Sequence, residues 1–331
     1  MRPISYARAT GVADAIATVS ADPGLAFLAG GTTEIDLLRR NVVQPAGLID
    51  INDLPLDRIE DLADGGLRLG ALARMSEVAE AAGVVARFPA IAQALLLGAS
   101  PQLRHMASIG GNLLQRVRCS YFRDGVSPCN KREPGTGCAA LEGINRGHAI
   151  LGTSEHCIAT HPSDLAVALV ALDAVIHTRG PRGARAIPVE EFFLLPRDTP
   201  HLEHPLYHGE LIVAVEVPAS PVARRSLYLK VRDRESYEFA LASAAVALRV
   251  ERGKVSQVRL ALGGIATRPW RARRAEQVLL GAPAETASFD RAADEEMASA
   301  VPRGLNAFKV ALARRTIVRA LETATTTGGP A

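Results

Sequence analysis

Four cysteines, all that this 331-residue chain contains, lie between Cys119 and Cys157. Nine, eight and eighteen residues separate them in turn, so the Cys-x-x-Cys pair of zinc ribbons and thioredoxin-like sites is missing. Four thiolates in a loop rich in glycine and proline can still bind one [4Fe-4S] cluster, because such ligation does not demand a single spacing. We therefore favour a cluster held by Cys119, Cys129, Cys138 and Cys157. A structural zinc ion, and scattered thiols or two disulfides, remain as alternatives.

Basic residues are concentrated around the same stretch. Four thiolates around an oxidised cluster leave an anionic assembly, which nearby cations stabilise. The cations that fit this requirement are Arg116, Arg118, Arg123, Lys131 and Arg132.

Two glycine turns could hold a phosphate group. The first, Gly30-Gly31-Thr32-Thr33-Glu34, follows an apolar strand at residues 25–29 and precedes a short helix. The second runs through Ala107-Ser108-Ile109-Gly110-Gly111-Asn112. Glycines let the backbone approach an anion closely, and helix N-terminal amides lack partners within the chain. Taken alone, each motif is explained more simply as a tight turn.

Two charged residues are further candidates. Asp164 follows Pro162 and Ser163 in the first turn of an expected helix, where it either complements the helix dipole or accepts hydrogen bonds from a ligand. Lys230 lies within an expected strand, a position at which a lysine is usually solvated rather than functional.

The pattern of apolar residues alternates between strands and helices and predicts a mixed α and β protein. A boundary is expected near residues 219–225, followed by three strands and three helices. Residues 324–331 are expected to form a disordered tail. The other expected strands cover residues 25–29, 47–53, 65–72, 173–180 and 210–218, and the helices cover residues 11–20, a segment from 76, 90–97, 272–280, 290–300 and 307–323.

Composition excludes several classes of protein. The net charge of +3 is spread along the chain, so neither a nucleic-acid-binding stripe nor an acidic tail is indicated. The first twenty residues lack an uninterrupted apolar segment, and the longest apolar run is broken by Asp173, so we expect neither a signal peptide nor a membrane span.

The order of these motifs carries more information than any one of them. The segments LAGGTTEI, ASIGGNLLQ, the cysteine-rich stretch, HPSDLA, ELIVAVEVP and LYLKVRDR follow one another along nearly the whole chain. This order resembles the FAD-binding subunits of the molybdenum hydroxylases, the family of xanthine dehydrogenase and aldehyde oxidoreductase. The cysteine-rich insertion is most similar to that of bacterial three-subunit, periplasmic-type aldehyde oxidoreductases, whose flavin subunit carries an additional [4Fe-4S] cluster. 4-Hydroxybenzoyl-CoA reductase has a similar insertion.

The resemblance implies an α+β fold with a two-part FAD-binding domain of the vanillyl-alcohol-oxidase-like (PCMH) type at residues 1–222. Its subdomains would cover about residues 1–57 and 58–222, with the cluster insertion at about 115–160. A C-terminal α/β domain with a three-stranded sheet and helices would follow at residues 223–323.

The resemblance also implies which residues hold the cofactors. The four cysteines would bind the cluster, and Ile212 would lie near the flavin ring. Thr33 stands where many members have aspartate. No catalytic side chain is implied, because the redox cofactors carry the chemistry. The FAD contacts would be Leu28, Ala29, Gly30, Gly31, Thr32, Thr33, Glu34, Ile35, Ser108, Gly111, Asn112, Asp164, Ile212 and Lys230.

Four cysteines suffice for one cluster, so the [2Fe-2S] centres of this family must belong to another chain. The resemblance thus implies an electron-transfer subunit that works with a molybdopterin-binding large subunit and a small [2Fe-2S] subunit, in a heterotrimer or its dimer. Such a complex would be cytoplasmic, or periplasmic if it is exported folded on a partner's twin-arginine signal. The alternatives are the flavin subunit of a 4-hydroxybenzoyl-CoA reductase-like or xanthine dehydrogenase-like enzyme and a non-enzymatic subunit stapled by zinc.

Overall fold

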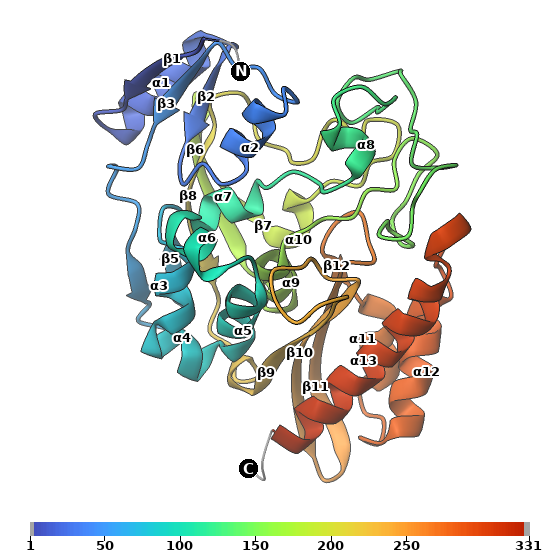
Figure 1. Ribbon diagram of the computed structural model, residues 1–331. Coiled ribbons are helices and arrows are strands. Elements are labelled where there is room, and N and C mark those ends of the chain that lie inside the picture. The colour runs from blue at the N-terminus through green and yellow to red at the C-terminus, as the bar shows by residue number, and fades with distance from the viewer. Residues whose placement is uncertain (1–2, 328–331) are drawn as a thin grey trace.

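The computed structural model describes residues 3–327 and contains three sheets (Figure 1). In the first sheet, strands β1, β3 and β2 lie side by side in that order, and all are parallel. Helices connect the strands because parallel neighbours need a crossover connection. This unit comprises β1 (Ser5–Arg8), α1 (Val12–Ala21), β2 (Leu25–Leu28), α2 (Glu34–Arg39) and β3 (Gly47–Asp50).

The second sheet is antiparallel and has the strand order β4-β5-β8-β6-β7. All eight residues of helix α9 are buried, which explains why its sequence is almost continuously apolar. The strands are β4 (Ile59–Asp61), β5 (Leu67–Gly70), β6 (Val175–Gly180), β7 (Gly183–Pro188) and β8 (Leu211–Val217). The helices of this part are α3 (Met75–Glu80), α4 (Ala82–Arg87), α5 (Pro89–Leu97), α6 (Pro101–Met106), α7 (Ile109–Leu113), α9 (Asp164–Ala171) and α10 (Val189–Phe192).

The third sheet belongs to the C-terminal part and has the strand order β12-β11-β10-β9. The prediction of three strands was wrong, because Trp270 and Arg271 turn back and pair with Leu262 and Ala261 as a fourth strand. The elements are η1 (Ala223–Arg225), β9 (Ser226–Val231), β10 (Ala242–Glu251), β11 (Lys254–Gly263), β12 (Trp270–Arg271), α11 (Arg273–Leu279), α12 (Thr286–Met297), η2 (Gly304–Asn306) and α13 (Phe308–Thr327).

The expected tail also needs correction. Helix α13 continues to Thr327, because Leu321 and Ala324 are buried in the core of the C-terminal part. The remainder of that prediction, residues 328–331, lies outside the described residues.

The cysteine-rich stretch forms an irregular lobe beside α13 (Figure 1, upper right). Its one helix is α8 (Ser120–Arg123), and Leu37 of α2 packs into its small core with Phe122. Buried polar groups attach the lobe to the C-terminal part. Asn306 donates to the carbonyl oxygens of His148 and Ala149, and the Lys309 ammonium donates to those of Gly147 and Gly264, at 2.8 and 2.6 Å.

Lys309→Met is expected to lower the free energy of unfolding by about 2–4 kcal/mol, because two buried carbonyl groups lose their hydrogen-bond donor. Burial lowers the pKa of Lys309 from 10.5 to about 7. Between those values the unfolded chain binds more protons than the folded one, so the advantage of wild type over the variant should grow as the pH rises from 7 to 9. Urea unfolding at both pH values tests this. Lys254→Met, at an exposed position, is the control. The prediction would be contradicted if the difference in free energy of unfolding between wild type and Lys309→Met were the same at both pH values.

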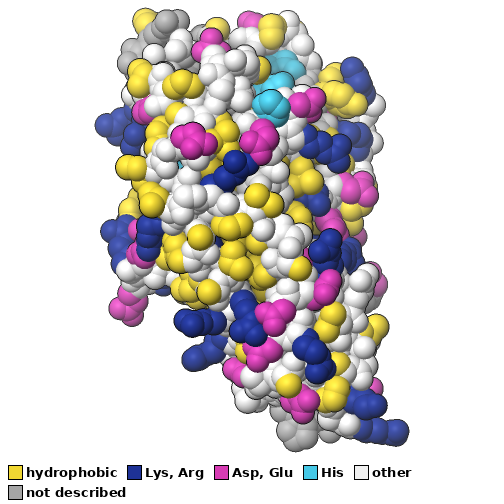
Figure 2. Space-filling model, turned by 90° about the vertical axis from the view of Figure 1, so that its right-hand side faces the viewer, with side chains coloured by type: hydrophobic (Ala, Val, Ile, Leu, Met, Phe, Trp, Pro, Cys, Tyr) yellow, Lys and Arg dark blue, Asp and Glu magenta, His cyan; other side chains and the backbone are white. Residues whose placement is uncertain are grey.

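The outer surface carries charges of both signs. Figure 2 shows acidic and basic side chains interspersed over the face that includes the C-terminal helices, in keeping with the small net charge. Between residues 3 and 327, no helix combines the length and apolarity needed to cross a membrane.

Candidate functional site

Two adjoining cavities lie where the glycine turns meet. The larger has a volume of about 610 Å³ and the smaller about 220 Å³. Thr32, Thr33, Ala107 and Gly111 line both cavities, so both turns lie where the two cavities meet. The two turns, far apart in the sequence, thus build one continuous site.

The first turn connects β2 to α2 and packs directly on the second. A Cβ atom added to Gly30 would lie 2.0 Å from the carbonyl oxygen of Met106, so only glycine permits this approach. Gly31 has a φ of +70°, a conformation that favours glycine. The threonines that follow present their side chains to the cavities.

The second turn leads into helix α7. The Ser108 hydroxyl accepts a hydrogen bond from the Gly111 amide at 3.3 Å and caps the helix. A Cβ atom added to Gly111 would meet only that hydroxyl, so this glycine leaves open space where the cavities join. The side-chain oxygen Oδ1 of Asn112 accepts a hydrogen bond from the Ser163 hydroxyl at 2.5 Å, which fixes the side-chain amide at the wall of the larger cavity.

Asp164 and Lys230 form a buried ion pair at the wall of the larger cavity, with 2.7 Å between Oδ2 and Nζ. The Lys230 side chain is 1% exposed, so the expectation of a solvated lysine was wrong. Lys230 also donates to the carbonyl oxygen of Leu97 at 3.0 Å, and the Tyr228 hydroxyl donates to Asp164 at 2.5 Å. Burial raises the pKa of Asp164, although Lys230 opposes this. The charges of the ion pair are therefore stabilised by the Tyr228 hydroxyl and the Leu97 carbonyl group rather than by water.

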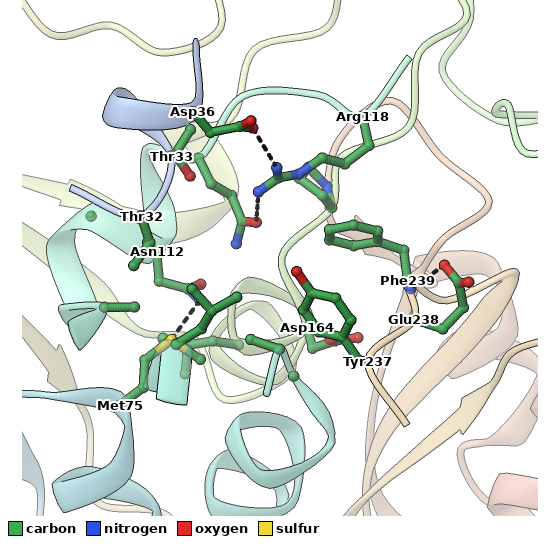
Figure 3. Close-up of a pocket in the computed structure, with 18 of the residues that line it drawn as sticks. Thr32, Thr33, Asp36, Met75, Asn112, Arg118, Asp164, Tyr237, Glu238 and Phe239 are labelled. Atoms are coloured by element: carbon green, nitrogen blue, oxygen red, sulfur yellow. Dashed lines mark hydrogen bonds and ion pairs between the residues drawn. The ribbon is translucent and has the colours of Figure 1, made fainter. Parts of the chain in front are cut away.

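The larger cavity is also lined by residues that the sequence motifs did not predict to lie there. Asp36 forms ion pairs with Arg40, Arg118 and Arg123, and the Arg118 guanidinium lies over the ring of Phe239, 4.9 Å from its centroid. Phe239 and Tyr237 belong to the loop between β9 and β10 and extend toward the cavity (Figure 3). Burial lowers the pKa of Arg118. From the sequence, Arg118 and Arg123 were expected to lie near the cysteines, and no motif marks the loop between β9 and β10.

Most of the expected FAD-contacting positions line one cavity or the other. Ile212 lines the smaller cavity, whereas Asp164 and Lys230 line the larger one, so Ile212 and Lys230 lie at different ends of the site. Neither cavity is lined by Leu28 or Ile35. The expected positions that line a cavity are Ala29, Gly30, Gly31, Thr32, Thr33, Glu34, Ser108, Gly111, Asn112, Asp164, Ile212 and Lys230.

All four cysteines line one small, separate cavity, and all are free thiols rather than disulfides. The Cys119 sulfur lies 3.2 Å from His148 Nε2. Burial raises the pKa of Cys119 to about 12 and that of Cys157 to about 11, so these thiols are neutral unless a metal replaces the proton.

The described residues contain no group of three or more His, Cys, Asp or Glu side chains placed around a single metal ion. A zinc ion needs all its ligands about 2.3 Å from one point, so this geometry does not support the zinc alternative. A cubane cluster differs, because its four thiolates bind four different iron atoms and stand farther apart. All four thiols nevertheless line one cavity, which has a volume of about 10 Å³.

Comparison with known proteins identifies the chain. Residues 2–220 match the family model of the FAD binding domain in molybdopterin dehydrogenase, and residues 227–324 match that of the CO dehydrogenase flavoprotein C-terminal domain. The chain belongs to the FAD-binding subunits of the molybdenum hydroxylases. This family member is thus an oxidoreductase subunit and has FAD as its cofactor. The cavities fit that cofactor, because Gly111 leaves space where the two turns and the two cavities meet.

Individual relatives agree with this assignment. This FAD-binding subunit is 47% identical to the aldehyde oxidoreductase FAD-binding subunit PaoB of Escherichia coli (strain K12), over 97% of this chain and 98% of the relative. It is 26% identical to the putative xanthine dehydrogenase FAD-binding subunit XdhB of the same organism, over 90% and 87%. The structure of carbon monoxide dehydrogenase from Hydrogenophaga pseudoflava, which lacks the Mo-pyranopterin moiety, matches with a TM-score of 0.76 and 26% identity, over 98% of this chain and 99% of that chain. The subunit therefore has the α+β fold of the carbon monoxide dehydrogenase medium chain, and these matches name no iron–sulfur cluster.

Proposed function

We propose that this chain is the FAD- and [4Fe-4S]-containing electron-transfer subunit of a molybdenum-dependent aldehyde oxidoreductase. Electrons would arrive from a molybdopterin-binding large subunit and a small [2Fe-2S] subunit and leave to an external acceptor. The observation that carries the cluster assignment is that Cys119, Cys129, Cys138 and Cys157 all line one cavity. The chain would thus hold two redox groups, and a partner would oxidise the substrate.

The two proposed sites are adjacent in the chain. Arg118 lines the larger cavity, and the next residue, Cys119, lines the cysteine cavity. Leu37 of α2 belongs to the small hydrophobic core that contains Cys129 and Phe122, so the helix after the first glycine turn also supports the cysteine lobe. Adjacency of this kind suits transfer of electrons between the two groups.

We further propose how FAD divides between the cavities. The turns at Gly30–Glu34 and Ser108–Asn112 would hold the pyrophosphate where the two cavities meet, so that backbone amides and hydroxyls can donate to it. The flavin ring would occupy the larger cavity beside Asp164 and Lys230, and Ile212 would contact the adenine end rather than the ring. When bound, FAD supplies the electron-transfer chemistry, and this chain's residues bind it and set its potential.

The domain division proposed from this arrangement follows the sheets. The first sheet ends at Asp50 and the second begins at Ile59, which supports subdomains of about 1–57 and 58–222 with the cluster insertion at about 115–160. The third sheet begins at Ser226, which supports a C-terminal domain from residue 223.

The aldehyde substrate and the partner subunits are proposed from the 47% identity to the aldehyde oxidoreductase subunit, compared with 26% to the xanthine dehydrogenase subunit. Partner sequences, with or without a twin-arginine signal, would decide between periplasm and cytoplasm.

The test is the visible absorption spectrum and the iron, sulfide and flavin content of the full chain purified anaerobically. We expect about four irons per chain, together with stoichiometric FAD released on denaturation. Cys138→Ser should lose the iron and keep the FAD, because Cys138 lines the cysteine cavity and neither FAD cavity. Ser120→Ala, at an exposed position beside Cys119, is the matched control and should keep both. FAD without iron in the wild-type chain would contradict the cluster and leave the flavin assignment standing.

A further inference from the structure

Lysine is rare in this chain, and its positions are unusual. Four of the 38 lysine and arginine residues are lysine. Lys131, Lys230 and Lys309 are largely buried, with side chains 9% and 1% exposed for the first two and Lys309 at 0%, whereas Lys254 is exposed. Each buried ammonium donates to a backbone carbonyl group. Because buried lysines are costly unless paired, these positions need an explanation.

Two of the three buried lysines share a further feature. Lys230 pairs with Asp164 at 2.7 Å and donates to a carbonyl oxygen at the wall of the larger FAD cavity. Lys131 pairs with Glu203 at 3.1 Å and donates to the carbonyl oxygen of Pro200 at 2.7 Å, at the wall of the cysteine cavity. Each proposed redox site thus has one buried lysine, held in place by a carboxylate and a carbonyl group from other segments.

The carboxylate of Glu203 links the cysteine cavity to the FAD site. It forms a second ion pair with Arg116, which lines the smaller FAD cavity, and the Arg116 guanidinium lies 4.8 Å from the centroid of the Phe122 ring. Burial opposes ionisation of Glu203, but Arg116 and Lys131 outweigh burial and hold its pKa below the usual value. Glu203 is therefore charged and holds Lys131 in one place. The segment that carries it, between α10 and β8, supplies none of the expected cofactor ligands.

We propose that Lys131, held by Glu203, is the fixed charge that sets the redox potential of the group bound by the four cysteines; this inference rests on the proposed cluster. A cluster held by the four cysteines would gain one negative charge with each electron that it accepts. A fixed cation at the wall stabilises that added charge and raises the potential, since net charge and hydrogen bonding set cluster potentials. Lys131 is thus a positioning residue that acts on electron transfer through charge rather than through ligation.

The experiment measures the cluster potential of the full chain by redox titration followed by electron paramagnetic resonance, after iron and FAD contents are established. Lys131→Met should lower the potential, and Glu203→Gln, which leaves the lysine uncompensated, should raise it. We expect each shift to change the ratio of reduced to oxidised cluster at a fixed potential about tenfold, equivalent to about 59 mV for one electron. Lys131→Arg should restore the wild-type potential, and Lys254→Met should not change it.

Potentials that shift in opposite directions in Lys131→Met and Glu203→Gln distinguish an effect of charge from structural damage, because structural damage would not shift the potential in opposite directions in the two variants. Unchanged potentials in variants that keep four irons would overturn the inference and leave the cluster in place. A wild-type chain with FAD and no iron would overturn the proposed cluster and the inference together. If Lys131→Met fails to fold, Lys131→Gln takes its place, and a potential that does not fall in that variant refutes the role of Lys131.

Discussion

Lys230→Met is expected to destabilise the fold and to lower the redox potential of the bound flavin. Removal of one partner from a buried ion pair costs about 3–5 kcal/mol, because the remaining charge is left without compensation. Here the remaining charge is Asp164, which is 8% exposed and whose pKa is already raised by burial. Loss of the cation beside the flavin cavity also removes an interaction that favours the electron-rich state of the flavin. Urea unfolding and a flavin redox titration measure the two effects.

Asp164→Asn and the double variant are the controls for this prediction. With Lys230 gone, the folded-state pKa of Asp164 should rise further, so the folded chain binds more protons than the unfolded chain and the stability of Lys230→Met should fall as the pH rises. Lys230→Met with Asp164→Asn removes both charges and should recover part of the lost stability. Asp164→Asn alone should raise the flavin potential. A flavin potential that stays the same in Lys230→Met would refute the electrostatic role and leave the lysine a structural residue.

The sequence predicted β2 and α2 on either side of the first glycine turn, because apolar residues and glycines mark them, but it predicted neither α6 nor α7, the helix that contains Gly110 and Gly111. It failed at β12, where only two residues, Trp270 and Arg271, pair with the sheet. No periodicity is visible in so short a strand. The length of α13 was underestimated because its last turns are threonine-rich, and burial of Ala324 rather than helix propensity extends it.

The candidate site was predictable where function depends on local chemistry and unpredictable where it depends on contacts between distant segments. The two glycine turns are visible in the sequence, but their contact at Gly30 and Met106 is not. Tyr237 and Phe239 lie in a loop without a motif, and Glu203 looks like an ordinary surface acid until the fold places it between Arg116 and Lys131. Lys230 was expected to be solvated because the strand pattern does not reveal which face of β9 meets Asp164.

Gly30→Ala and Gly111→Ala are expected to impair FAD binding for different physical reasons. The new Cβ at position 30 would lie 2.0 Å from the carbonyl oxygen and 2.8 Å from the carbonyl carbon of Met106, so the two turns must separate. Overpacking of this kind costs about 1–3 kcal/mol or more, and the apo chain should lose stability as well as FAD. At position 111 the Cβ meets only the Ser108 hydroxyl, at 2.9 Å, and otherwise projects into the place where the cavities join.

Gly111→Ala should therefore keep its fold and lose affinity for FAD. Alanine is favoured over glycine in a helix by about 1 kcal/mol, which offsets a weakened Ser108 cap. We expect the dissociation constant of FAD to rise about tenfold or more, since a steric cost of about 1.4 kcal/mol suffices for that factor. Gly147→Ala, whose Cβ would meet nothing within 4 Å, is the control. Fluorescence titration with FAD and thermal unfolding of the apo chain separate the two variants. Normal FAD affinity in Gly111→Ala would mean that the cofactor does not pass between the two turns, and the proposed division of FAD between the cavities would fail.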